Sequence, residues 1–166
     1  MNMNIDQVTA GNTIFIAANI FIYHFTAQSP ACSALLRRCQ DDVIIGCTSV
    51  GCVAEMLHRL MIAEAVQKGY ITIRNAVRAL KEKQDIVKKL DRYLQTPTRL
   101  IEMKIKILPT TSEIVLCSKA IRKRYGLLTN DSLIVTTIKK HRLKLLAVDK
   151  DFENIPGIQL YKPADL

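Results

Sequence analysis

The most constraining feature of this 166-residue chain is a dense apolar stretch near its amino end, from Thr13 to Phe25. Its first five residues, Thr13 to Ala17, read as a short strand that is apolar without interruption, as buried parallel strands are. From Asn19 the pattern becomes helical. In open α/β sheets, ligands bind at the carboxyl end of such a strand. Ala17 holds that position, and its methyl group offers no reactive atom.

Short β-rich runs and helical patterns alternate along the rest of the chain. The other predicted strands cover 43–48, 104–109, 142–148 and 158–161, and the predicted helices cover 19–25, 30–39, 49–68, 75–95, 112–125 and 129–138. Such alternation predicts an α/β fold, a three-layer α/β/α sandwich with a central, mostly parallel sheet. We expect one domain over 13–163 with a helical excursion at about 70–100. Residues 1–12 are polar without a clear period, which predicts a loosely held N-terminal extension.

The charge of the chain favours a polyanionic partner. Lys and Arg exceed Asp and Glu by 24 to 15, a formal net charge of +9, which is typical of proteins that bind RNA, acidic proteins or membrane surfaces. A solvated basic surface is the alternative. Aromatic residues make up only 5% of the chain, so few side chains could stack on nucleic-acid bases. Binding of a nucleic acid would therefore depend mainly on charge.

The cysteines indicate a reducing compartment. They are Cys32, Cys39, Cys47, Cys52 and Cys117. Their number is odd, they contain no C-x-x-C pair, and several sit in apolar runs, so we expect buried thiols in the cytoplasm rather than a metal site or a disulfide framework. The first apolar stretch is too short to span a bilayer and follows no Lys or Arg, which argues against a signal peptide and a membrane partner.

Acidic residues fall where predicted strands give way to helices or loops. Glu55 lies one turn into a helix, Asp131 begins another, and Asp149 and Asp151 follow the strand at 142–148. Parallel topology brings such ends to one edge of the sheet. Clustered carboxylates repel one another unless a cation neutralises them, and their hard oxygens suit Mg²⁺ or Mn²⁺. The matching chemistry is metal-assisted hydrolysis of a phosphodiester.

Each of these acids also has a purely structural interpretation. Glu55 precedes Arg59 by four residues and so can form an ordinary helical ion pair. Asp131 can complement a helix dipole in the first turn. Asp149 and Asp151 can be turn residues. Only the joint placement of the four favours the metal site.

Four short motifs follow one another along the chain. They are Ile14 to Tyr23, Thr48-Ser49-Val50 with Ala54-Glu55 and Leu57, Leu128 to Ile134, and Asp149-Lys150-Asp151-Phe152 with Ile155-Pro156 and Tyr161. In this order and spacing they resemble the motifs of the PIN domains, and within them the VapC-like ribonuclease toxins of type II toxin–antitoxin systems. The first motif of that family reads strand-Asp-x-Asn-x-hydrophobic-x-Tyr, and this chain departs from it only at Ala17.

The resemblance implies an acidic quartet that binds one or two divalent cations, Mg²⁺ or Mn²⁺, and cleaves RNA through a metal-activated water. Carried over by position, the catalytic places fall on Ala17, Glu55, Asp131 and Asp149, the metal ligands on Glu55, Asp131, Asp149 and Asp151, and the supporting residues on Asn19, Thr129 and Asn130. The implied partners are an RNA substrate, a cognate antitoxin protein and a second copy of the chain in a homodimer.

Ala17 changes the expected mechanism most, because its methyl group cannot bind a cation while the remaining carboxylates still repel one another. We predict weak metal binding and little or no nuclease activity. An engineered substitution, made to produce a toxic nuclease safely, is favoured over natural loss. The alternative function is a non-catalytic PIN-like module that binds RNA or a partner without cutting.

Overall fold

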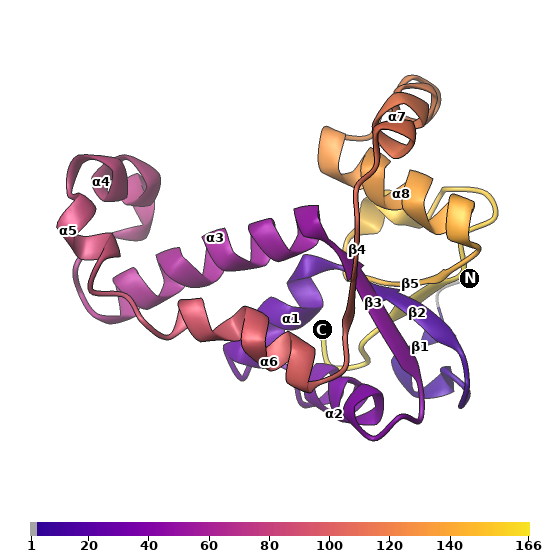
Figure 1. Cartoon of the computed structure of the whole chain (residues 1–166), viewed down its shortest axis with the longest axis horizontal. Helices are drawn as coiled ribbons and strands as arrows, with labels where there is room; N and C mark the ends of the chain where they lie inside the picture. Colours follow the sequence, from indigo (N-terminus) through magenta and orange to yellow (C-terminus); the bar gives the residue numbers. More distant parts are fainter. Residues whose placement is uncertain (1–2) are drawn as a thin grey trace.

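One six-stranded sheet forms the centre of the computed structural model, which describes residues 3–166 (Figure 1). The strands are β1 (Met3–Asn4), β2 (Thr13–Ile16), β3 (Ile45–Ser49), β4 (Lys106–Leu108), β5 (Lys144–Leu146) and β6 (Leu160–Lys162). They lie in the order β1-β6-β5-β2-β3-β4, and each neighbouring pair is parallel. The α/β class is therefore confirmed, with a sheet that is parallel throughout.

The first apolar stretch supplies the middle of this sheet. Phe15 of β2 pairs with Cys47 of β3 on one side and with Leu145 of β5 on the other. Ile14, Phe15 and Ile16 are 0% exposed. Burial of an aliphatic or aromatic side chain of this size stabilises a fold by about 1.5–3 kcal/mol, so β2 is a main source of core energy. Because its neighbours run parallel to it, their carboxyl ends share one edge.

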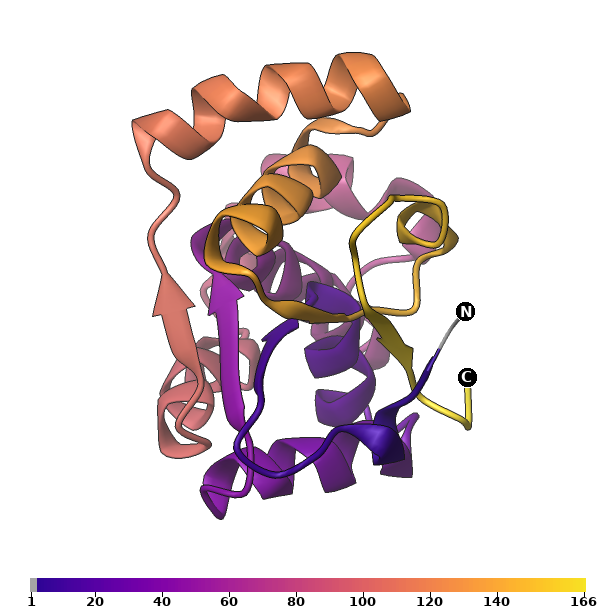
Figure 2. The ribbon, with the colours of Figure 1, turned by 90° about the vertical axis from the view of Figure 1, so that its right-hand side faces the viewer.

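Helices cover both faces of the sheet (Figures 1 and 2). They include α1 (Ala18–Phe25), α2 (Pro30–Gln40), α3 (Val50–Gln67), α7 (Ser112–Tyr125) and α8 (Thr129–His141). α1 packs against α2 and α3 on one face, and α8 covers the other with α7 stacked outside it. These layers form the predicted three-layer sandwich. None of the helices within residues 3–166 is both long and apolar enough to cross a membrane.

Residues 3–12 are held more firmly than we expected. β1 pairs with β6, and Asn4 caps a short 3-10 helix, η1 (Ile5–Gln7). Ile5 and Val8 are each 1% exposed, and the Arg38 side chain of α2 donates to the Val8 carbonyl. The prediction of a loose extension is wrong for these residues, because two apolar side chains anchor an otherwise polar segment. Residues 1 and 2 lie outside the described part of the chain.

The excursion after α3 is helical, as predicted, but the single helix over 75–95 is wrong. It is divided into η2 (Ile73–Asn75), α4 (Ala76–Glu82), α5 (Gln84–Val87), η3 (Tyr93–Gln95) and α6 (Thr96–Glu102). The chain bends because the buried carboxylate of Glu64, on α3, accepts hydrogen bonds from the backbone N–H groups of Asp91 and Tyr93 at 3.1 and 3.0 Å. Pro97 then lies in the first turn of α6, so it begins a helix where we expected an end.

The excursion has a small hydrophobic core of its own. Ala65 of α3, Leu80 of α4 and Leu90 form it, separately from the main core around the sheet. The far half of α3 thus supports the excursion, while its first half packs beside the sheet edge.

The prediction of buried cysteine thiols is confirmed for four of the five. Cys32, Cys39, Cys47 and Cys52 are buried and unpaired, whereas Cys117 is exposed on α7. Burial raises the pKa of both Cys39 and Cys47 to about 12, so these thiols stay protonated and unreactive.

Candidate active site

Ala17 lies at the carboxyl edge of the sheet, where β2 passes into α1. Its backbone N–H donates to the carbonyl of Leu146 at the end of β5, 3.0 Å away. It also occupies the N-cap position of α1, with φ −75° and ψ 159° and no side-chain hydrogen bond to the helix. In contrast, side chains cap three of the other α-helices within residues 3–166, namely Ser29 at α2, Ser49 at α3 and Thr111 at α7. Alanine is among the poorest N-cap residues, so α1 lacks a side chain that this position normally supplies.

Asn19, in the first turn of α1, carries an oxygen without a partner. Its Oδ1 atom is buried and accepts no hydrogen bond from any residue within 3–166. An unsatisfied buried polar atom costs about 1–3 kcal/mol, so it is uncommon unless a ligand uses it. The oxygen lies at the predicted site and is a ready acceptor for a cation or a donor group.

Glu55 joins α3 to α8. Its Oε2 accepts a hydrogen bond from Asn130 Nδ2 at 2.9 Å, and its Oε1 lies 4.0 Å from Arg59 Nε. The structural ion pair that we considered is therefore present but long, and a bond between the two helices accompanies it. Gly51 allows this approach, because a Cβ atom there would meet Asn130 Oδ1 at 2.8 Å. Sequence reasoning missed Gly51, for which the signal was a glycine in the first turn of a helix.

Asp131 is the electrostatic centre of the site. Burial, and after it the negative charges of Asp149, Asp151 and Glu55 in that order, together raise the pKa of its carboxyl group to about 6. All four predicted carboxylates are thus close enough to influence one titration. Such a shift at the carboxyl edge of a parallel sheet is typical of functional sites.

The first turn of α8 holds Thr129 and Asn130. Leu128 takes the N-cap position and makes no side-chain cap, so neither Thr129 nor Asn130 caps the helix. The Asn130 amide instead donates to Glu55. The Thr129 side chain is exposed, and its hydroxyl forms no hydrogen bond within residues 3–166.

Asp149 and Asp151 follow β5 in the short helix η4 (Lys150–Phe152) and its cap. Asp149 is the N-cap residue, and its Oδ1 accepts from the backbone N–H of Asp151 at 3.0 Å. Asp149 therefore does act as a turn residue, the alternative raised above. This bond occupies one carboxylate oxygen, and both side chains are exposed beside Asp131.

The side chains present do not fit a divalent cation as they stand. Within residues 3–166, no three carboxylate, thiol or imidazole groups lie close enough together to hold a metal ion. Burial, and to a lesser extent the charges of its neighbours, raise the pKa of Asp131, and an added cation would relieve the repulsion between the charges. Ala17, at the strand end, contributes no oxygen to complete the set.

A hollow of about 630 Å³ opens beside this acidic edge. It is lined by Asn19, Ile22, Tyr23 and Gln28 after β2, by Glu55 and Arg59 of α3, and by Val148, Asp149 and Lys150 after β5. Asp131 and Asn130 are not part of its lining. The hollow therefore lies on the α1 and α3 side of the acids.

Known proteins share both the sequence pattern and the fold of this chain. A family model described as PIN domain matches residues 14–158. Ribonuclease VapC2 of Methanocaldococcus jannaschii is 30% identical over 150 residues, covering 90% of this chain and 93% of that protein. Ribonuclease VapC6 of the same organism is 27% identical over 160 residues, covering 91% and 97%.

Two solved structures have a similar fold at low sequence identity. A toxin–antitoxin complex from Klebsiella pneumoniae aligns with a TM-score of 0.52 at 23% identity, covering 87% of this chain and 94% of that one. VapBC2 from Rickettsia felis, bound to a DNA fragment from its promoter, aligns with a TM-score of 0.57 at 14% identity, covering 90% and 98%. With the sheet order, the acidic edge and the family match in agreement, this chain belongs to the PIN domain family.

Proposed function

We propose that this chain has the framework of a VapC-like endoribonuclease toxin and lacks one catalytic carboxylate at Ala17. The observation that carries the proposal is the raised pKa of Asp131 among Glu55, Asp149 and Asp151 at the carboxyl edge of a PIN sheet. The two Methanocaldococcus relatives are ribonucleases by name. A cluster of acids at this edge suits hydrolysis of RNA phosphodiester bonds.

PIN-family ribonucleases generally use a divalent metal ion. Once a carboxylate is restored at position 17, we propose Glu55, Asp131 and Asp149 as the further ligands with Asp151 as an auxiliary, and Asn19, Thr129 and Asn130 as the supporting residues. Hard carboxylate oxygens favour Mg²⁺ or Mn²⁺. Because Ala17 supplies no oxygen, we expect weak metal binding and little or no cleavage.

The decisive experiment restores the missing carboxylate. Ala17→Asp is assayed for cleavage of total cellular RNA with Mg²⁺ or Mn²⁺, and the fragment ends are mapped. Ala17→Asn is the matched control, because it keeps the size and capping ability of Asp without its charge. We expect cleavage by the Asp variant alone, abolished by chelator. A folded Ala17→Asp protein that cuts no RNA would refute the ribonuclease proposal.

A non-catalytic module is the second candidate. Two observations favour it, namely Ala17 itself and the lack of a three-ligand set within residues 3–166. This function predicts RNA or partner binding that is insensitive to chelator. It also predicts that the Ala17→Asp protein stays inactive.

The partners and location follow from the same proposal. The Klebsiella structure is a toxin–antitoxin complex, which supports a cognate antitoxin as the partner of this chain, and we propose a homodimer in the same assembly. The four buried, unpaired cysteines fit the reducing cytoplasm. Co-purification with a tagged chain that is expressed from its own locus tests for the antitoxin. Light scattering of the purified chain tests for the homodimer.

A further inference from the structure

We propose that the hollow beside Glu55 and Asp149 seats a nucleotide of single-stranded RNA, with Arg59 and Lys150 holding its phosphates. The choice of RNA rests on the proposed function. The placement rests on the chemistry of the lining, which combines two cations, an apolar wall and two amides.

The two cations come from different elements and meet at the same hollow. Arg59 extends from α3 with its side chain 66% exposed, and its ion pair with Glu55 is long at 4.0 Å. Lys150, in η4, is exposed and forms no ion pair within residues 3–166. An exposed pair of this length contributes little, so both cations are available to phosphate oxygens.

The two cations offset the repulsion between the acidic edge and an RNA phosphate. A phosphodiester that approaches Glu55 and Asp149 meets like charge, and the net charge of +9 is spread over the whole chain. Within the hollow the two cations balance the two carboxylates. RNA that approaches the acidic edge from this side therefore meets less repulsion than it would from the carboxylates alone.

The remaining lining suits a base. Ile22, Tyr23 and Val148 are partly buried and form an apolar wall, while Asn19 and Gln28 provide amide groups. Single-stranded RNA is recognised by stacking or packing of unpaired bases and by hydrogen bonds to their edges. The volume of about 630 Å³ is within the usual range of small-ligand sites.

Other hollows also contain cations but lie apart from the acidic cluster. One of about 450 Å³ is lined by Lys139, Arg142 and Lys144 and has no carboxylate in its lining. The one between α7 and α8 is about 240 Å³ and mainly apolar, and its Lys140 is already paired with Glu113. The one between α1, α3 and α6 is about 530 Å³ and is lined by two cations, Arg92, which donates to Gln67, and Arg99. Neither contains a residue of the acidic cluster.

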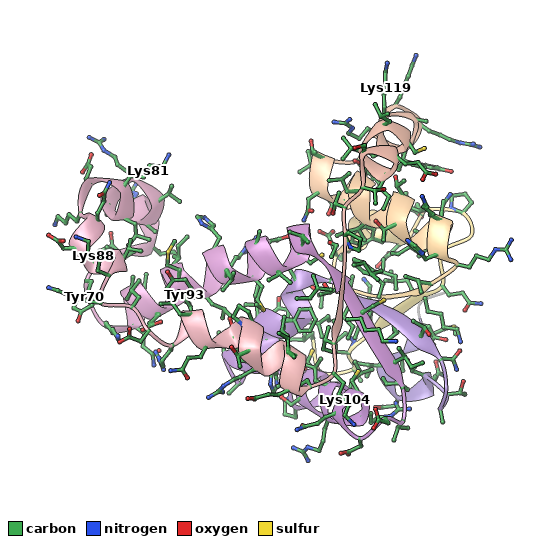
Figure 3. The ribbon with its side chains drawn as sticks, viewed as in Figure 1. Tyr70, Lys81, Lys88, Tyr93, Lys104 and Lys119 are labelled. Carbon is green, nitrogen blue, oxygen red and sulfur yellow. The ribbon has the colours of Figure 1, made fainter. Side chains whose placement is uncertain are left out.

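The basic excursion is the main rival surface. Figure 3 shows Lys81 on α4 and Lys88 at the C-cap of α5, near the end of α3 that points away from the sheet. Lys88 is paired with Asp85 at 2.9 Å, and the excursion has no acidic cluster that RNA must reach. A binding experiment can separate this surface from the hollow.

The chain as it stands is suited to the test, because Ala17 lets RNA binding be measured with little cleavage. A short fluorescent single-stranded RNA is titrated by anisotropy at several salt concentrations. Each phosphate contact on a single strand contributes about 0.7 to the slope of log affinity against log salt. We expect Arg59→Ala and Lys150→Ala each to lower the slope by about 0.7 and to weaken binding about fivefold at 0.1 M salt. Arg59→Lys should keep the slope.

Lys81→Ala and Lys119→Ala are the controls, on the excursion and on α7, and both should leave the slope unchanged. Circular dichroism melts verify that all variants are folded. Three results would each overturn nucleotide binding in the hollow. They are an equal loss of RNA affinity in Lys81→Ala, an unchanged salt slope in both Arg59→Ala and Lys150→Ala, and no RNA binding at low salt. Cleavage by Ala17→Asp is measured separately. RNA binding in the hollow without any cleavage would support the binding proposal and refute the ribonuclease proposal.

Discussion

Replacement of Asp131 by Asn should stabilise the fold at high pH and leave it unchanged at low pH. The pKa of Asp131 rises from 3.8 to about 6 on folding because of burial and the neighbouring acids. One pKa unit corresponds to about 1.4 kcal/mol, so the shift corresponds to roughly 3 kcal/mol before screening. The residue is only partly buried and water screens its neighbours, which reduces our expectation to about 1–1.5 kcal/mol.

The sign follows from the raised pKa. Below pH 3.8, Asp131 is protonated in both the folded and the unfolded chain, so it carries no penalty. As the pH rises through about 6, the folded chain must ionise Asp131 beside its neighbours and loses stability. Asn carries no charge at any of these values. The benefit of Asp131→Asn should therefore appear between pH 4 and pH 7 and be complete at pH 8.

Urea unfolding in the presence of a chelator measures this difference, because a bound cation would mask the repulsion. The parent, Asp131→Asn and Asp41→Asn are compared at pH 4 and pH 8. Asp41 is an exposed residue after α2, away from the acidic edge, and its variant controls for the loss of one charge. A stabilisation of equal size at both pH values, or a loss of stability at pH 8, would refute the electrostatic reasoning.

Three further substitutions test other parts of the structure. Ala17→Asn should raise the free energy of unfolding by about 1 kcal/mol through a new N-cap at α1, and an unchanged urea midpoint would contradict this. Glu64→Ala removes the buried acceptor of two backbone N–H groups, so we expect about 2–4 kcal/mol of destabilisation and faster amide exchange at Asp91; exchange at the parent rate would show that the bend holds without Glu64. Gly51→Ala places a methyl group against Asn130 and should lower stability by about 1–3 kcal/mol, whereas in the Asn130→Ala background it should cost less; additive losses would mean that the two residues do not touch.

Local sequence signals predicted the framework well. Uninterrupted apolar character placed β2 in the sheet centre, and the helices predicted over 30–39 and 112–125 match α2 and α7 closely. The parallel alternation also brought the acids to one edge, which the pKa of Asp131 reflects. These features depend on periodicity and topology, which are visible within short windows of sequence.

Contacts between distant residues could not be predicted in this way. The amphipathic pattern over 75–95 favours one helix, but buried Glu64 binds the backbone of Asp91 and Tyr93 and breaks it. Ile5 belongs to no periodic pattern, and it is buried where η1 contacts α2. The bond from Asn130 to Glu55 depends on how closely α3 and α8 approach, which no local pattern contains.

The separate small core of the excursion has a consequence for how the chain moves and evolves. Because Ala65, Leu80 and Leu90 pack apart from the sheet, the excursion can open as a unit while the strands stay paired. Its amides should then exchange at a common rate, faster than those of β2. Residues on its surface can also diverge without disturbing the acidic edge, so specificity for a new partner can be acquired there independently of the catalytic framework.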